Sequence, residues 1–309
     1  MTNKVLVTGA TGFIGRHCLP LLLERGYEVH AVTSNKSGKF LSRVKWHVAD
    51  LLDLKPLQEL ILKFQPTHLL HLAWYVIPGK LIKASENLQW VQTSLDLLQL
   101  FQEHGGKRIV MAGSCYEYDW NYGYCSEFLT PRVPATFYGK CKNSLQTLLD
   151  AYSIETGLSS AWGRVFFVYG PHEYSTRLVS SVIGSILHGE PALCSHGNQI
   201  RDYLYVEDVA DAFVSLLESE VFGPVNVGSG RPVFLKEIIF RIAGKLKRED
   251  LIRLGELPVS PNEAALVVAD VNRLFDEVGW RPKYDLDHGL EQTIQWWKSQ
   301  LKYEVEKKI

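Results

Sequence analysis

Three glycines near the amino terminus constrain the fold of this chain more than any other feature. In "KVLVTGATGFIGRHCLPLLLERGYEVHAVTSNK" a β-branched strand over 5–7 leads into a GxxGxxG spacing, and apolar residues follow at helical spacing over 13–25. Strand, tight turn, helix and second strand form the opening of a βαβ unit. Gly9 and Gly12 allow close backbone approach and Gly15 lets helix pack on strand, so a dinucleotide pyrophosphate would rest on the helix N-terminus.

Strands and helices continue to alternate along the chain. Expected strands at 44–49, 69–72 and 108–112 are separated by helical patterns at 54–64 and 84–104. This order predicts an α/β fold with a doubly wound, parallel Rossmann-type sheet. Such sheets bind ligands beyond the carboxyl ends of their strands. At those ends we expect Asp50 and Leu51 near the adenine of a dinucleotide, and Leu72, Ala73 and Trp74 along the rest of the cofactor.

Size and charge agree with an enzyme that acts on small molecules. A chain of 309 residues exceeds the usual size of a single core, so we expect one large domain and a smaller lobe. The net charge of −1, with both signs interspersed, indicates neither nucleic acid nor an anionic membrane as partner. No apolar stretch approaches the ~20 residues of a bilayer span and no basic-then-apolar leader precedes Val5, so we expect a cytoplasmic protein.

Cysteine and histidine spacing predicts no metal site. The five cysteines are scattered and form no CxxC pair, which is typical of reduced thiols without structural zinc. His68 and His71 lie three apart in one expected strand and therefore point to opposite faces.

The stretch "FYGKCK" carries the sharpest chemical signal. Tyr138 and Lys142 stand four apart at the start of a helical pattern, so both side chains project from one helix face. A nearby ammonium and a positively charged nicotinamide ring would stabilise phenolate and lower the tyrosine pKa from about 10 toward working pH. Tyr138 would then exchange a proton with a substrate oxygen. A surface packing pair with the same spacing is the alternative.

The chain resembles the extended short-chain dehydrogenase/reductases, in the NAD-dependent epimerase/dehydratase group that acts on nucleotide sugars. The resemblance covers nearly the whole chain, and several weak motifs in the family's order make it specific. These motifs are "GATGFIG" (Gly9 to Gly15), Asp50-Leu51, "HLAW" (His71 to Trp74), Asn87, "AGSCYEY" (Ala112 to Tyr118), Tyr138 with Lys142, "VYGP" (Val168 to Pro171), "RDYLYVEDVADA" (Arg201 to Ala212), "NVGSG" (Asn226 to Gly230) and "GWRP" (Gly279 to Pro282).

The resemblance implies a role for individual residues. The family's catalytic triad falls on Ser114, Tyr138 and Lys142: the serine hydrogen-bonds the reacting oxygen, the tyrosine is the acid/base, and the lysine holds the nicotinamide ribose while lowering the tyrosine pKa. The dinucleotide-binding domain is expected over 1–165, completed by parts of 204–230, and a smaller mixed α/β substrate lobe over 166–309. The expected cofactor contacts are Gly9, Thr11, Gly12, Phe13, Ile14, Gly15, Thr33, Ser34, Asn35, Lys36, Asp50, Leu51, Leu72, Ala73, Trp74, Asn87, Tyr138 and Lys142.

On the substrate side, Arg201 matches the arginine with which the family grips a diphosphate, and an ion pair with Asp202 is the structural alternative. Two positions depart from the family. Phe167 stands where relatives usually have asparagine, and Ser260 replaces a second phosphate-gripping arginine, for which Arg177 is a candidate substitute. The expected substrate contacts are Ser114, Cys115, Tyr116, Arg177 and Arg201.

The residues after the catalytic serine restrict the reaction. Sugar 4,6-dehydratases of the family follow the catalytic threonine with Asp-Glu, whereas this chain has Cys115 and Tyr116, so dehydration is not expected. Epimerase/reductases of the GDP-fucose type place a cysteine two residues after the serine and a histidine beyond "GPH". Here Cys115 is one residue off, and no histidine lies between His172 and His188. Reduction of a 4-keto sugar or 4-epimerisation remains.

The end of the second strand favours one of these two reactions. NAD-retaining epimerases normally present an acid there to the adenosine ribose, but this chain presents Thr33, Ser34, Asn35 and Lys36. Hydroxyls, an amide and an ammonium suit a 2′-phosphate, which a carboxylate would repel. We therefore favour NADP(H) and a 4-ketoreductase, with NAD(H) and a 4-epimerase as the alternative.

Two further expectations concern the chain outside catalysis. Members of this fold that have lost activity serve as dinucleotide-sensing regulators, but retention of the whole triad argues against that here. The resemblance also implies a homodimer, formed through helices over 87–101 and 138–152.

Overall fold

The larger sheet is parallel throughout and has seven strands. The computed structural model describes residues 3–34, 41–259 and 263–306, with side chains described as far as residue 301. From edge to edge the sheet contains β11 (Gly223–Val227), β7 (Ser159–Val165), β5 (Arg108–Ser114), β4 (His68–His71), β1 (Lys4–Thr8), β2 (Glu28–Thr33) and β3 (Lys45–Val48).

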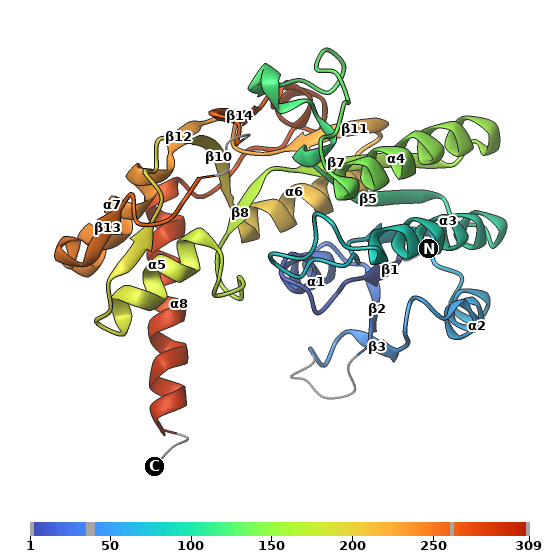
Figure 1. The fold of residues 1–309 in the computed structure, drawn as a ribbon. Helices are drawn as coiled ribbons and strands as arrows, with labels where there is room; N and C mark the ends of the chain where they lie inside the picture. Colours follow the sequence, from blue (N-terminus) through green and yellow to red (C-terminus); the bar gives the residue numbers. More distant parts are fainter. Residues whose placement is uncertain (1–2, 35–40, 260–262, 307–309) are drawn as a thin grey trace.

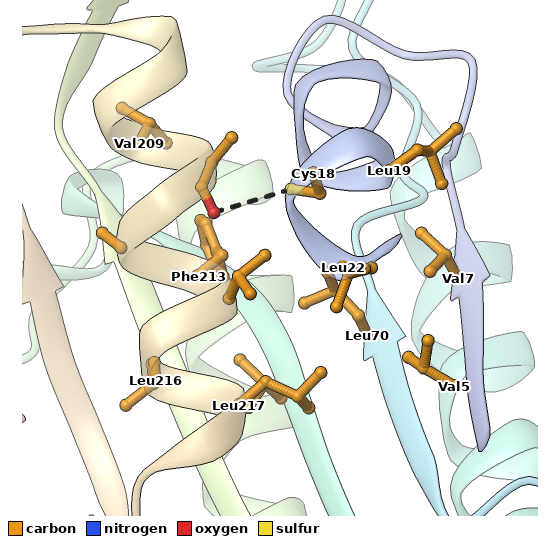
Figure 2. Packing of buried hydrophobic residues seen from close by; sticks show 14 of the residues in the cluster. Val5, Val7, Cys18, Leu19, Leu22, Leu70, Val209, Phe213, Leu216 and Leu217 are labelled. Atoms are coloured by element: carbon orange, nitrogen blue, oxygen red, sulfur yellow. Dashed lines mark hydrogen bonds between the residues drawn. The ribbon is translucent and has the colours of Figure 1, made fainter. Parts of the chain in front are cut away.

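Helices cover both faces of this sheet. On one face lie α1 (Gly15–Glu24) and α6 (Val206–Glu218), and on the other α2 (Leu54–Phe64), α3 (Glu86–Glu103) and α4 (Phe137–Thr156). Figure 2 shows the first face, where Cys18 and Leu22 of α1 meet Phe213 of α6 above the apolar side chains of β1 and β4. This arrangement confirms the predicted doubly wound Rossmann-type fold.

Local signals place the helix that carries Tyr138. The side chain of Thr136 accepts a hydrogen bond from the Gly139 N–H at 3.0 Å, which satisfies one free donor of the first turn of α4. At the other end Gly157 adopts φ +71°, the left-handed conformation that ends many helices. The start of α4 also lies against the turn after β5, because a Cβ on Gly139 would come within 2.1 Å of the Tyr116 carbonyl oxygen.

The second lobe has a smaller, mixed sheet. Its path is β12 (Pro232–Phe234), β10 (Ile200–Tyr205), β14 (Leu266–Ala269) and β6 (Tyr124–Cys125), with β8 (Phe167–Tyr169) also paired to β10. Only the β10–β12 pair is antiparallel. A separate parallel pair joins β9 (Ala192–Cys194) to β13 (Ile252–Leu254), and α5 (Leu178–Leu187), α7 (Leu235–Leu246) and α8 (Leu286–Glu306) pack around a third hydrophobic cluster.

The chain passes between the two sheets several times. After β8 and β10 have formed in the second sheet, α6 and β11 return to the large one, while β6 joins the second sheet from within the first half of the chain (Figure 1). The predicted division at residue 165, with parts of 204–230 added to the first domain, stays a proposal. Within the described residues, no helix is both long and apolar enough to cross a membrane.

Candidate active site

The glycine-rich turn is built so tightly that side chains at two of its glycines would clash. Gly9 has φ +68°, and a Cβ there would lie 2.7 Å from the Ala73 backbone nitrogen. A Cβ on Gly15 would lie 2.2 Å from the Gly9 carbonyl oxygen. Gly12 and Thr11 are exposed, and among the described residues no side chain caps α1 at Ile14. The backbone N–H groups at this helix end therefore fit a dinucleotide pyrophosphate.

Residues expected near the adenosine lie at the carboxyl ends of β2 and β3. Thr33 ends β2 and is 3% exposed, and its carbonyl accepts the Ala49 N–H at 3.0 Å. Ser34 beside it is exposed. Asp50 accepts the Leu52 N–H at 3.0 Å through Oδ1. Asn35 and Lys36 lie outside the described residues.

The structure brings the three expected catalytic side chains together. Ser114 ends β5, which runs two residues further than expected because it pairs with β7 as far as Val165. Ser114 lies close enough to Tyr138 for its hydroxyl to favour the charged form of the tyrosine as a hydrogen-bond donor. One turn along α4, the Lys142 ammonium donates to the Ala112 carbonyl at 2.8 Å. All three side chains are buried.

The electrostatics of the tyrosine differ from the expectation. Burial raises the pKa of Tyr138, and the hydrogen bond from Ser114 opposes that rise only in part. In this structure the Lys142 ammonium does not lower the pKa of Tyr138 as expected, because it is directed at the Ala112 carbonyl and at the ring of Trp74. Burial also lowers the pKa of Lys142 to about 7. The site as described therefore holds a neutral phenol, which is the form that donates a proton.

Behind the triad lies a buried carboxylate that sequence reasoning missed. Glu117 is 0% exposed and forms an ion pair with Arg164, Nε to Oε2 at 2.6 Å. It also accepts the Ser114 N–H at 2.7 Å and the Trp162 indole N–H at 3.0 Å. Glu117 thus holds the backbone of the catalytic serine. An acid inside the apolar stretch "AGSCYEY" was the available signal, since buried acids are almost always paired.

The loop between β4 and α3 is held by Asn87. Its Nδ2 donates to the carbonyls of Leu81 and Ala84 at 2.7 and 2.8 Å, and its Oδ1 accepts the Trp74 indole N–H at 2.8 Å. Both ends of the Asn87 amide are therefore used within the protein. Its expected contact with the cofactor stays a prediction, and so does that of Ala73, whose backbone lies against Gly9.

Arg201, one of the expected substrate contacts, is paired with a different acid from the one that the sequence suggested. Arg201 is 3% exposed, and its guanidinium lies 5.5 Å from the centre of the Phe167 ring. Its ion pair is with Glu263 at 3.1 Å, while Asp202 accepts the N–H groups of Ser229, Gly230 and Ala269 instead. The structural alternative of an Arg201–Asp202 pair is therefore not what the described residues form.

Arg177, Tyr116 and Cys115 differ in exposure. Arg177 is exposed at the start of α5, and its positive charge lowers the pKa of Tyr116, which burial raises more strongly. The Cys115 side chain is 2% exposed in a hydrophobic cluster with Tyr118 and Phe166. Burial raises the pKa of this thiol far above its ordinary value. A substrate contact by Cys115 stays a prediction that this packing does not favour.

The sequence and the fold of this chain match those of known proteins. The sequence profile of the "NAD dependent epimerase/dehydratase family" matches residues 5–228. The dTDP-4-dehydro-6-deoxyglucose reductase of Escherichia coli is 26% identical over 324 residues, covering 95% of this chain and 97% of that protein. The UDP-N-acetylglucosamine 4-epimerase of Methanobrevibacter ruminantium, solved with UDP-N-acetylmuramic acid, superimposes with TM-score 0.87 at 25% identity, covering 97% and 100% of the two chains.

A third match was solved with a dinucleotide. The UDP-glucose 4-epimerase of Thermus thermophilus in complex with NAD has TM-score 0.83 at 27% identity, with 96% of this chain and 99% of that chain covered. Relatives of this kind are NAD(P)-dependent enzymes of the short-chain dehydrogenase/reductase type. Together with the glycine-rich turn and the assembled triad, these matches show that the chain belongs to the NAD-dependent epimerase/dehydratase family.

Proposed function

We propose that this enzyme reduces the 4-keto group of a nucleotide-linked sugar with NADPH. The observation that carries the choice is the residue at the end of β2: Thr33 stands where an acid would contact the adenosine ribose, and the exposed Ser34 follows it. A carboxylate there would repel a 2′-phosphate, whereas hydroxyl groups can donate hydrogen bonds to its oxygens.

Each triad residue has a defined task in this reaction. A bound nicotinamide would supply the hydride that reduces the carbonyl carbon. Tyr138, a neutral phenol here, donates its proton to the carbonyl oxygen, and Ser114 donates a hydrogen bond to the same oxygen. Lys142 would hold the nicotinamide ribose through its ammonium. Since Glu117 fixes the backbone of Ser114, the hydroxyl that receives the substrate oxygen is held before the substrate arrives.

The residues beside Ser114 support chemistry at the carbonyl carbon alone. Removing a proton from a carbon next to the carbonyl needs a base, and a pair of carboxylates or an accessible thiolate would supply it. Cys115 is buried with its pKa raised, and burial likewise raises the pKa of Tyr116. Neither group is suited to act as a base near neutral pH, so dehydration and 3,5-epimerisation are disfavoured.

We assign the nucleotide diphosphate to the second lobe. The Arg201 guanidinium lies 5.5 Å from the centre of the Phe167 ring and donates to the Ile200 carbonyl and to Glu263. We assign its remaining N–H groups to phosphate oxygens, which a planar guanidinium suits. Arg177 lies at the start of α5, exposed, and supplies a second positive charge. The nucleotide base is left open.

A 4-epimerase that retains NAD is the second candidate, because structural relatives of high similarity are 4-epimerases and one was solved with NAD. The two functions differ in what leaves the enzyme. A reductase consumes one NADPH for each sugar, whereas an epimerase returns its cofactor unchanged after each turnover.

The test is to add NADPH or NADH to the purified protein with 4-keto nucleotide sugars and to follow absorbance at the nicotinamide band. We expect stoichiometric oxidation of NADPH and a slower reaction with NADH. Interconversion of two 4-epimeric nucleotide sugars without net cofactor oxidation would identify the epimerase instead. Binding without either reaction would indicate a dinucleotide-sensing regulator.

We also infer a homodimer formed through α3 and α4. These helices pack together, and their outward surfaces carry large apolar side chains that are 47–72% exposed, namely Leu88, Leu148 and Ile154. Sedimentation equilibrium should give twice the chain mass, and Leu148→Glu should lower it toward the monomer.

A further inference from the structure

The ammonium group of Lys142 lies on the face of an aromatic ring. Its Nζ is 3.6 Å from the centre of the Trp74 ring, well within the ~6 Å range of cation–π attraction. Lys142 is 4% exposed and Trp74 is 8% exposed, so little water screens the contact. Attraction of this kind is strongest where both partners are desolvated.

The other groups around the ammonium offer it weaker support, and they include a second ring, that of Trp162, whose centre lies 5.7 Å from Nζ. The Ala112 carbonyl accepts one of its three N–H donors at 2.8 Å. Glu117 from the turn after β5 favours the charged form through its negative charge, but its oxygens are bound to Ser114, Trp162 and Arg164. Among the described residues, no carboxylate lies within ion-pair distance of Lys142.

The remaining titratable neighbours carry no charge that would help. His71 on β4 is bound between the hydroxyls of Thr8 and Ser94, and burial lowers its pKa to about 3, so it is neutral. Tyr138 on the same helix as Lys142 has its pKa raised and is also neutral. Burial has brought the pKa of Lys142 itself to about 7, so its charge at neutral pH depends on small favourable contacts.

The indole of Trp74 is held in the orientation that presents its face. Its N–H donates to the Asn87 Oδ1 at 2.8 Å, and Asn87 is anchored in turn to the carbonyls of Leu81 and Ala84. Fixing the edge of the indole in this way leaves the negative face of the ring directed at Lys142. The ring also meets Tyr138 edge-on, with centroids 6.4 Å apart.

We propose that Trp74 is a positioning residue of the triad, whose indole face keeps the Lys142 ammonium charged and holds it beside the Ala112 carbonyl. The inference rests on the role of Lys142 in the proposed function. It goes beyond that function because it makes the protonation state of Lys142 depend on Trp74, a residue that does not itself exchange protons with the substrate.

The test reduces the negative charge on the face of the Trp74 ring while nearly preserving the shape of the ring. Tryptophan 74 is replaced by 5-fluoro- and then 5,7-difluorotryptophan through nonsense suppression, which withdraws charge from the face while keeping the indole N–H for Asn87. The titration of Lys142 is read from the ¹³Cε signal of lysine-labelled, cofactor-free protein, assigned by its loss in Lys142→Arg. We expect the midpoint to fall in two steps, by about one pH unit in total.

Trp90 provides the matched control. Its ring contacts Trp74 with centroids 6.2 Å apart, and among the described residues its ring makes no cation–π contact with Lys142. The same fluorinated residues at position 90 should leave the midpoint of Lys142 unchanged. A midpoint unaffected by fluorination at position 74, or equally affected from position 90, would overturn the proposal.

The readout separates this inference from the proposed function, because it needs no turnover. If the midpoint falls as expected but no 4-keto sugar is reduced, the cation–π role stands and the proposed function fails. In active protein, the pH above which NADPH affinity declines should fall by the same amount as the Lys142 midpoint.

Discussion

Glu117→Gln is the substitution whose effect on the free energy of unfolding follows most directly from the structure. The carboxylate is fully buried, and its two oxygens face the N–H groups of Ser114, Trp162 and Arg164. Glutamine has the same shape but offers one acceptor oxygen and directs an NH₂ group at one of these donors. The substitution therefore leaves Arg164 without its counter-charge and creates a donor facing a donor.

Removing one partner of a buried ion pair typically costs about 3–5 kcal/mol, because the other charge stays buried. Arg164 keeps two neutral acceptors, the Tyr118 hydroxyl at 3.0 Å and the Gln146 amide oxygen at 2.9 Å, which places the expected loss near the lower limit, at about 3 kcal/mol. Adding Arg164→Met removes the stranded charge. The double variant should then cost at least about 1 kcal/mol less than the sum of the single variants.

Urea unfolding followed by circular dichroism measures both values, with the transition slope as a check that the same surface is exposed. In the folded Glu117→Gln protein kcat should also fall, since the Ser114 backbone loses the acceptor that positions it. A loss below about 1 kcal/mol, or strictly additive single and double variants, would refute the reasoning that this carboxylate holds the site.

Three further predictions address the site and the second lobe. Tyr138→Phe keeps the ring and deletes the acid, so kcat should fall about 10²–10⁴-fold with an unchanged unfolding midpoint; a variant that keeps most of its kcat would sink the assignment. Thr33→Asp should reverse a preference for NADPH over NADH in titration calorimetry, and equal or tighter NADH binding by the unaltered protein would contradict it. Burial raises the pKa of Glu173 from its ordinary 4.5 to about 8. As pH rises, the unfolded chain therefore loses this proton before the folded protein does. The contribution of Glu173 to the free energy of unfolding is complete below about pH 4.5 and is lost above about pH 8. Glu173→Gln should accordingly gain melting temperature relative to the unaltered protein between pH 5 and pH 8.5, and a constant difference would speak against it.

The large sheet was predictable because its elements are specified locally. The expected helix over 54–64 coincides with α2, whose start is set by the Asp53 cap and whose end by Gln65 in the left-handed conformation. The glycine spacing fixed the first βαβ unit through backbone contacts that a Cβ would break. By contrast, the return of β11 to the large sheet and the entry of β6 into the second depend on pairing between distant segments. The expectation that parts of 204–230 complete the first domain came from the family resemblance, and the entry of β6 was not predicted.

The site was predictable where a residue's role follows from its spacing, and not where it follows from its surroundings. Spacing placed Tyr138 and Lys142 on one helix face, and the family resemblance added Ser114. The lowering of the tyrosine pKa was expected from the ammonium together with a nicotinamide ring and stays a prediction. In the protein alone burial raises this pKa, and the ammonium is directed to Ala112 and Trp74, contacts between residues 30 or more positions apart. Glu117, in the turn after β5, was missed for a similar reason, since its partner Arg164 lies on β7, 47 residues further along the chain.

The most direct test of the central claim follows where deuterium enters the product. With 4-deuterated NADPH in ordinary water, the account predicts one deuterium at C4 of the sugar and none elsewhere. With unlabelled NADPH in deuterium oxide, it predicts no carbon-bound deuterium at C3 or C5 beyond a control without enzyme. Enzyme-dependent solvent deuterium at C3 or C5, lost in Cys115→Ser, would contradict the account and identify an epimerase/reductase instead.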